Sequence, residues 1–137
     1  MTYQMLSQAD RLKIVELLSP ICPSFIYLFG SAQRDELRPE SDVDIAFYHP
    51  QDVDFFVYLS VKESIASALS RDVDLVALKD ANDVLRAQVI GYGELLSARE
   101  PQVLYERQMR WLKQYAMLNQ ERAPILERIK REGRIYG

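Results

Sequence analysis

The stretch of sequence that decides the fold is Phe25–Tyr48, FIYLFGSAQRDELRPESDVDIAFY. An apolar, aromatic run ends at Gly30-Ser31, and Asp42-Val43-Asp44 then leads into a second apolar run. A strand that runs into Gly-Ser and a helix would present backbone N–H groups and a hydroxyl, and such a helix N-terminus binds phosphate well. Two aspartates that are two positions apart on a strand point to the same face. The stretch therefore predicts a phosphate-binding turn followed by a carboxylate pair.

The size and composition are those of one soluble globular domain. The chain has 137 residues, of which 48% are hydrophobic and 27% are charged, and this is enough to bury a core. No apolar run approaches the ~20 residues of a membrane span, and the N-terminus lacks the basic and apolar regions of a signal peptide. Cys22 is the only cysteine, so an internal disulfide is excluded and we expect a reducing cytoplasm.

The charge is unevenly distributed. Residues 1–99 carry 9 basic and 15 acidic side chains, a net charge of -6, whereas residues 100–137 carry 8 basic and 5 acidic side chains, a net charge of +3. An acidic body argues against general nucleic-acid binding. The basic tail is expected either to meet an anionic or protein partner or to form a solvated helix face.

The apolar pattern predicts alternating helices and strands. We expect strands at residues 24–29, 43–48 and 72–78, with residues 94–98 as a short edge strand or an extension. We expect helices from Ser7 to Pro20, over residues 31–37, over Asp52–Leu69, and from a cap formed by Asp80 and Asp83 through about Ile90, with Gly91 and Gly93 ending the last of these. This order predicts an α/β or α+β fold with a small mixed sheet of three to four strands flanked by helices.

The character of the chain changes from Glu100 onwards. Pro101 suits the first turn of a helix, and Pro124 is expected to begin a final short helix. The apolar residues of this tail fall on one helical stripe, Leu104, Trp111, Tyr115 and Leu118. We therefore expect a core over residues 1–98 and a helical tail over residues 99–137. The tail either packs on the core or uses part of the Trp111–Tyr115 stripe as a partner surface.

Acidic residues begin two of the predicted strands. Asp42 and Asp44 begin the second strand, and Asp72 and Asp74 begin the third. If these strands are neighbours, their carboxylates converge, and a divalent cation is the simplest relief of the repulsion. Mg²⁺ favours one or two carboxylates with water and phosphate oxygens, and two such ions clamp an in-line displacement at phosphorus. The lone histidine, His49, leaves almost nothing for a His-based triad or a zinc site.

These motifs together resemble a known family. Gly30-Ser31, ten residues and Asp42-Val43-Asp44 resemble the signature of the polymerase-beta-type nucleotidyltransferase superfamily. Arg34, the run 38–41 and Asp74-Leu-Val are similar to its minimal nucleotidyltransferase (MNT) branch, whose members are encoded beside HEPN toxins. One departure is Asp35, which stands where the family often has glycine and adds negative charge near the phosphates.

The resemblance implies a polymerase-beta-like core and a role for each motif residue. Asp42 and Asp44 would be catalytic metal ligands, and Asp74 the third acid, which completes the metal site or deprotonates the acceptor. Asp72 is the alternative third acid. The residues that would contact the triphosphate are Gly30, Ser31 and Arg34.

The resemblance also implies an activity. An MNT antitoxin would transfer AMP from ATP, with two Mg²⁺ ions, to a tyrosine hydroxyl of a cognate HEPN ribonuclease toxin and so neutralise it. One alternative is a non-catalytic antitoxin that binds its toxin through the basic, aromatic tail. A second is a nucleotidyltransferase for a small molecule of the aminoglycoside type, which is disfavoured because the chain has no visible second substrate-binding domain.

Overall fold

The computed structural model of the chain describes the backbone of residues 6–30 and 42–131. It describes side chains up to residue 119. The helix expected at residues 31–37 lies outside the described residues, as do Ser31 and Arg34. None of the helices in the described part of the chain has the length and apolar character needed to cross a bilayer.

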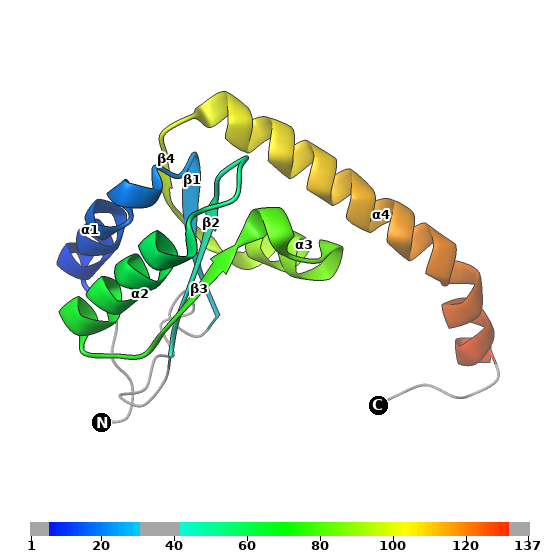
Figure 1. Ribbon diagram of the computed structural model, residues 1–137. Helices are drawn as coiled ribbons and strands as arrows, with labels where there is room; N and C mark the ends of the chain where they lie inside the picture. Colours follow the sequence, from blue (N-terminus) through cyan, green and yellow to red (C-terminus); the bar gives the residue numbers. More distant parts are fainter. Residues whose placement is uncertain (1–5, 31–41, 132–137) are drawn as a thin grey trace, which may run out of the picture.

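A four-stranded mixed sheet forms the centre of the molecule (Figure 1). The strands are β1 (Phe25–Phe29), β2 (Val43–Tyr48), β3 (Val73–Ala77) and β4 (Glu94–Ala98), and their order in the sheet is β3-β2-β1-β4. β2 and β3 run parallel, whereas β1 is antiparallel to both β2 and β4. The predicted fold class is confirmed, and residues 94–98 are an edge strand of the sheet.

Within the described part of the chain, four α-helices surround or extend this sheet. They are α1 (Gln8–Leu17), α2 (Phe55–Leu69), α3 (Asp83–Tyr92) and α4 (Pro101–Arg131), with short 3₁₀ helices η1 (Ser19–Ile21) and η2 (Leu78–Asp80). The capping box predicted for the first helix is present, because Ser7 and Asp10 exchange side-chain-to-backbone hydrogen bonds. Asp54 caps α2 in a similar way, since its carboxylate accepts from the backbone N–H groups of Phe56 and Val57.

Two predicted details of α3 are wrong. The residue that caps the helix is Asn82, whose Oδ1 accepts from the Leu85 N–H at 2.8 Å, and not Asp80, which belongs to η2. Amide and carboxylate oxygens cap helices about equally well, so the sequence did not discriminate between them. The helix also includes Gly91 and extends to Tyr92, whereas Gly93 ends it as expected. A side chain at residue 93 would clash with the Val89 carbonyl and lie 3.2 Å from the Leu28 carbonyl.

The predicted break at Pro124 is also wrong, because α4 is one helix of 31 residues. Proline removes one backbone hydrogen bond and crowds the preceding turn, and a long helix can respond by bending instead of ending. Figure 1 shows the last turns of α4 bending away from its long axis.

The two faces of the sheet are covered by different helices. Side chains alternate along β2, so Ile45 and Phe47 pack in the cluster that includes α1 and α2. Ala46 and Tyr48 belong to a second cluster with residues of α3 and α4. Asp44 has the same parity as Ala46 and therefore lies on the α3 and α4 face.

Aromatic packing attaches α4 to this second face. Trp111 is only 2% exposed, and its ring lies 6.2 Å from Phe25 and 5.6 Å from Tyr48, centre to centre. The Gln108 amide donates to the Tyr27 hydroxyl at 2.8 Å. Of the predicted stripe, Leu104 and Trp111 are buried, while Tyr115 and Leu118 are partly exposed. The orange part of α4 projects away from the sheet (Figure 1).

Candidate active site

The predicted acids lie at the start of two neighbouring parallel strands. Asp44 of β2 and Asp74 of β3 are directly opposite each other in the sheet. Adjacent strands are separated by about 4.8 Å, so the two side chains project side by side from the same face. Asp42 and Asp72 immediately precede the two strands and are exposed. The structure thus brings four carboxylates to one end of the sheet, with Asp44 and Asp74 paired.

Gly30 lies directly beside the Asp44 carboxylate. β1 ends at Phe29, which is the β-sheet partner of Asp44, and Gly30 then turns the chain with φ of +71°. A Cβ atom at residue 30 would fall on Asp44 Oδ2 and lie 3.2 Å from Cγ. Glycine is needed here both for the left-handed backbone and for the room that the carboxylate occupies. The family resemblance implies that Gly30 contacts the triphosphate, and in the structure its close neighbour is the Asp44 side chain.

The electrostatics of the site centre on Asp44. Its pKa is raised to about 6, first by burial of the half-buried carboxyl group, then by the negative charges of Asp74 and Asp42. Burial and repulsion both disfavour the ionised form of this carboxyl group. A nearby positive charge would therefore stabilise the ionised form. The charge of Asp74 acts on Asp44, whereas Asp72 is not among the causes of the raised pKa. This difference favours Asp74 over Asp72 as the third acid of the site.

The three acids supply the right ligand chemistry for a magnesium ion without being gathered around one point. Across residues 6–30 and 42–119, no group of three or more His, Cys, Asp or Glu residues is close enough to hold a metal ion. Mg²⁺ is commonly bound through one or two carboxylates, with water and substrate phosphate oxygens filling the other positions. The Asp42, Asp44 and Asp74 set fits that mode of binding, and an all-protein cage is not required.

The helices of the second face are anchored away from the acids. Trp111 packs on Phe25 and Tyr48, a strand pair at the opposite end of the sheet from the pair of Phe29 with Asp44. Four residue steps along a strand separate the two pairs, which corresponds to about 13 Å. The buried contacts of α4 therefore leave the acid-bearing end of the sheet to other segments or to a substrate.

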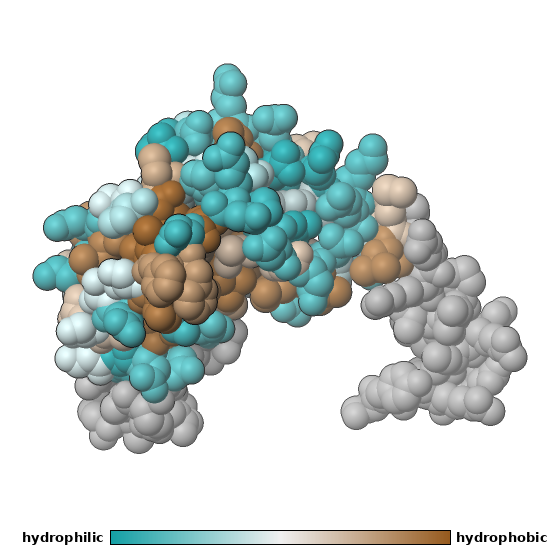
Figure 2. All heavy atoms as spheres, viewed as in Figure 1, coloured by the Kyte–Doolittle hydropathy of each residue, from teal (hydrophilic) through white to brown (hydrophobic). Residues whose placement is uncertain are grey.

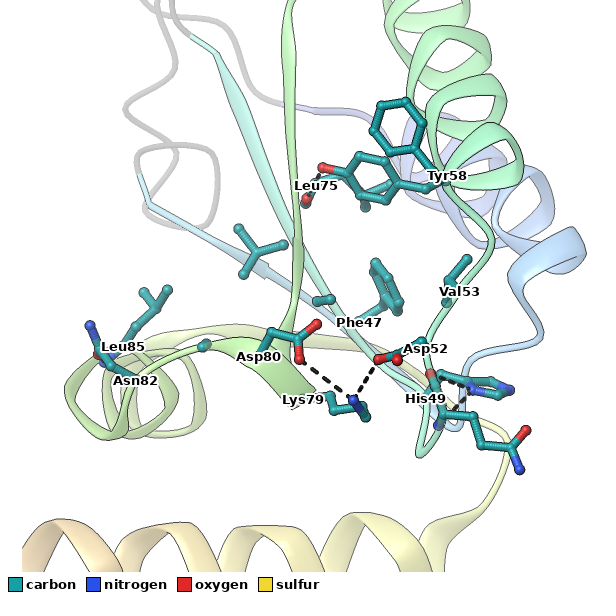
Figure 3. A pocket seen from close by; sticks show the side chains of 15 residues that line it. Phe47, His49, Asp52, Val53, Tyr58, Leu75, Lys79, Asp80, Asn82 and Leu85 are labelled. Carbon is teal, nitrogen blue, oxygen red and sulfur yellow. Dashed lines mark hydrogen bonds and ion pairs between the residues drawn. The ribbon is translucent and has the colours of Figure 1, made fainter.

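A pocket of about 610 Å³ lies elsewhere, around the carboxyl ends of β2 and β3 (Figure 3). Lys79 bridges Asp52 at 2.6 Å and Asp80 at 3.5 Å at its mouth, and these groups are largely exposed. Exposed ion pairs of this kind contribute little free energy. None of the three candidate acids lines this hollow, so we do not regard it as the reaction site. His49 lies at its rim, where the ring Nδ1 accepts from the Gln51 N–H at 3.1 Å.

One structurally important residue, Arg86, was not recognised from the sequence, and it lies beyond the end of β3, away from the acids. The Arg86 side chain donates to the carbonyls of Leu78 and Lys79 at 2.8 and 2.5 Å, and its guanidinium lies 4.8 Å from the centre of the Trp111 ring. It thereby connects the segment that leaves β3 to α4. Arg86 lies inside a predicted helix, and the local sequence does not indicate this role, because its partners Leu78, Lys79 and Trp111 are seven or more positions away.

Comparison with known proteins places these features in context. The sequence profile of "Polymerase beta, Nucleotidyltransferase" matches residues 13–102, which include all four strands. The protein adenylyltransferase MntA of Shewanella oneidensis is 33% identical over 125 residues, which cover 89% of this chain and 88% of that protein.

Two solved structures are similar along nearly their whole length. A toxin–antitoxin structure with AMP-PNP has a TM-score of 0.74 and 33% identity, over 88% of this chain and 98% of the other. A structure of tri-AMPylated Shewanella oneidensis HEPN toxin in complex with MNT antitoxin has a TM-score of 0.70 and 32% identity. That match covers 90% of this chain and 98% of the other.

Proposed function

The chain belongs to the polymerase beta nucleotidyltransferase family, and we propose that it is an antitoxin protein adenylyltransferase that modifies a cognate HEPN ribonuclease toxin. The acceptor in this proposal is a tyrosine hydroxyl of the toxin, and the donor is ATP. The observation that carries the proposal is the paired placement of Asp44 and Asp74 beside Gly30, in a chain similar to MntA along most of its length.

The proposed reaction is an in-line displacement at the α-phosphorus of ATP. The tyrosine oxygen forms a bond to the α-phosphorus, the bond from this phosphorus to the bridging oxygen of the β-phosphate breaks, and pyrophosphate leaves. The Asp74 carboxylate, exposed on β3, accepts the phenolic proton as general base. Asp74 and Asp44 are neighbours on parallel strands, so the acceptor and the α-phosphate would meet at the same end of the sheet.

Asp42, Asp44 and Asp74 are the residues that would hold Mg²⁺, with two ions in the complete site. When bound, Mg²⁺ neutralises phosphate charge and stabilises the attacking and leaving oxygens. The raised pKa of Asp44 supports this assignment. A carboxylate that is partly buried beside other negative charges is stabilised more by a bound cation than a fully solvated carboxylate is. Gly30, Ser31 and Arg34, which follow β1 in the sequence, would contact the triphosphate.

The biological role follows from the acceptor. AMP adds bulk and negative charge, which can close an RNA-binding site on a ribonuclease. We place this reaction in the cytoplasm and expect neither direct nucleic-acid binding nor membrane association by this chain. The tail over residues 99–137 is proposed as a partner-binding extension of the core over residues 1–98.

A labelling experiment tests the proposal. The purified chain is incubated with α-³²P-ATP, Mg²⁺ and the HEPN-type protein encoded next to it, and label on the acceptor is followed by gel and mass spectrometry. We expect transfer by the wild type, loss of transfer in the double variant Asp42→Ala with Asp44→Ala, and retention in Asp52→Ala, an exposed acid far from the site. Absence of label from the wild-type reaction, or transfer that survives the double substitution, contradicts the proposal.

The second candidate is an antitoxin that acts by binding alone, and it is favoured by the complexes that similar proteins form with their toxins. Co-expression in cells separates the two functions. Protection that persists in the double alanine variant would favour binding alone, whereas protection that requires both aspartates would favour catalysis.

A further inference from the structure

The exposed side of α4 has an apolar stripe with no partner in the described structure. Tyr105 is 67% exposed, Met109 is 72% exposed and Leu112 is 43% exposed. At about 100° per residue, these residues and Ala116 lie within about 60° of each other around the helix. We call Tyr105, Met109, Leu112 and Ala116 the outer stripe. It is separate from the buried side of α4, where Leu104 and Trp111 contact the sheet.

The outer stripe has the geometry of one side of a helix–helix seam. Its members follow one another at intervals of four, three and four residues. This is the spacing at which one α-helix packs along another, because it keeps the same seam facing the neighbour over successive turns.

The charged residues beside the outer stripe indicate the charge of its partner. Between residues 101 and 119, α4 carries three basic side chains and one acidic side chain, Arg107, Arg110, Lys113 and Glu106. Arg110 and Lys113 are exposed next to the stripe, and Glu106 stands one turn before Arg110. A partner helix with an apolar seam and acidic flanking residues complements this surface. Two copies of this basic surface would instead repel each other, apart from contacts made by Glu106.

The attachment of α4 to the sheet links this surface to the reaction. Gln108 bonds to Tyr27, and Trp111 packs on the same face of the sheet that carries Asp44 and Asp74. A protein held on the outer stripe is therefore held in a defined position relative to the acids. In Figure 2 the visible side of α4 is mostly hydrophilic, while apolar side chains gather over α2, where Phe55 and Phe56 are exposed. That second patch has no comparable spacing or charge pattern.

We propose that the outer stripe of α4 docks an amphipathic, acid-flanked helix of the protein acceptor and so presents the acceptor hydroxyl to the Asp44 and Asp74 end of the sheet. This inference rests on the proposed function, since it takes the acceptor to be the HEPN toxin. It assigns the recognition of that toxin to α4 and separates it from nucleotide binding at the strand ends.

The test uses a charge placed in the stripe and a matched charge outside it. Met109→Glu introduces a carboxylate at a residue that is already 72% exposed, so the chain is expected to fold. Gln114→Glu adds the same charge at an exposed residue about 180° around the helix from Tyr105. Affinity for the purified HEPN-type protein is measured by calorimetry, and binding of a fluorescent ATP analogue and the melting temperature are measured on the same samples.

We expect Met109→Glu to weaken acceptor binding by at least about tenfold, as for other interface anchors, with nucleotide binding unchanged. We expect Gln114→Glu to stay within about twofold of the wild type, as for substitutions outside an interface. Lys113→Glu should weaken binding most at low salt, because the attraction between exposed charges is screened as salt rises.

The outcomes distinguish failure of this inference from failure of the proposed function. Acceptor binding that is absent in the wild type, or equal in Met109→Glu and the wild type, overturns the inference. A wild-type dimer by light scattering that Met109→Glu converts to a monomer, with acceptor binding unchanged, assigns the stripe to a second copy and also overturns it. Stripe-dependent binding without AMP transfer supports the inference and refutes the proposed function.

Discussion

Substitution of Gly30 by alanine tests the geometry of the acid site at its closest contact. Residue 30 has φ of +71°, and the added Cβ would fall on Asp44 Oδ2. The left-handed conformation costs an alanine about 1–2 kcal/mol relative to glycine. Relief of the contact with Asp44 requires its carboxylate to rotate away or the turn to move. We therefore expect Gly30→Ala to lose about 1–2 kcal/mol of unfolding free energy and at least about 100-fold in AMP transfer, because a displacement of about 1 Å at a reacting group has that effect.

Two assays separate the two parts of this expectation. Urea unfolding measures the backbone strain, and AMP transfer to the acceptor measures the displacement of Asp44. The matched control is Gly91→Ala, since no atom lies within 4 Å of a Cβ at that position inside α3. That variant should be as stable as the wild type or more stable by up to about 1 kcal/mol, with unchanged transfer.

One outcome for Gly30→Ala would contradict the expected role of the Asp44 carboxylate. If Gly30→Ala transfers AMP within about twofold of the wild-type rate, a shift of the Asp44 carboxylate has no effect on the reaction, contrary to the sensitivity expected of a reacting group. A loss of activity with a normal unfolding free energy would instead place the effect on the substrate and not on the turn.

Three further predictions follow from particular residues. The pKa of Asp44 is raised in the folded chain, so its contribution to stability is present below about pH 4 and is lost as pH rises through about 6; urea unfolding of metal-free protein should show this decline, and Asp44→Asn should reduce it. Asp74→Asn should abolish AMP transfer while Asp72→Asn retains most of it, and equal losses in a single-turnover assay would contradict the assignment of the third acid. Trp111→Ala should lower the unfolding free energy by about 3–5 kcal/mol, because the ring is buried among aromatic neighbours; a loss below about 1 kcal/mol in thermal or urea unfolding would contradict the packing.

Local sequence patterns predicted the strands well. β2 begins at Val43 and ends at Tyr48, as expected from an apolar run between an acidic pair and Pro50. The capping box of Ser7 and Asp10 was recognisable because its two hydrogen bonds join residues three positions apart. Features of this kind depend on neighbours in the chain, and a single sequence contains them in full.

The same local rules failed where distant segments decide the outcome. Pro124 was expected to start a new helix, but α4 continues through it. The sequence left open whether Trp111 packs on the core or meets a partner, and the structure buries it, because Phe25 and Tyr48 of the sheet cover its ring. Exposure depends on which face of a helix meets the rest of the molecule, and periodicity finds apolar stripes without deciding which of them is covered.

The sequence by itself determined the order of the four strands, the acidic strand starts and the motif by which the chain resembles its family. Only the tertiary structure decided that β2 and β3 are parallel neighbours, and hence that Asp44 is paired with Asp74. It also decided that Gly30 is required by the Asp44 carboxylate, a contact between residues that are 14 positions apart in the sequence. The physical reason is that strand pairing and register arise from the packing of the whole sheet, whereas the residue types that make a site chemically competent are local properties of the chain.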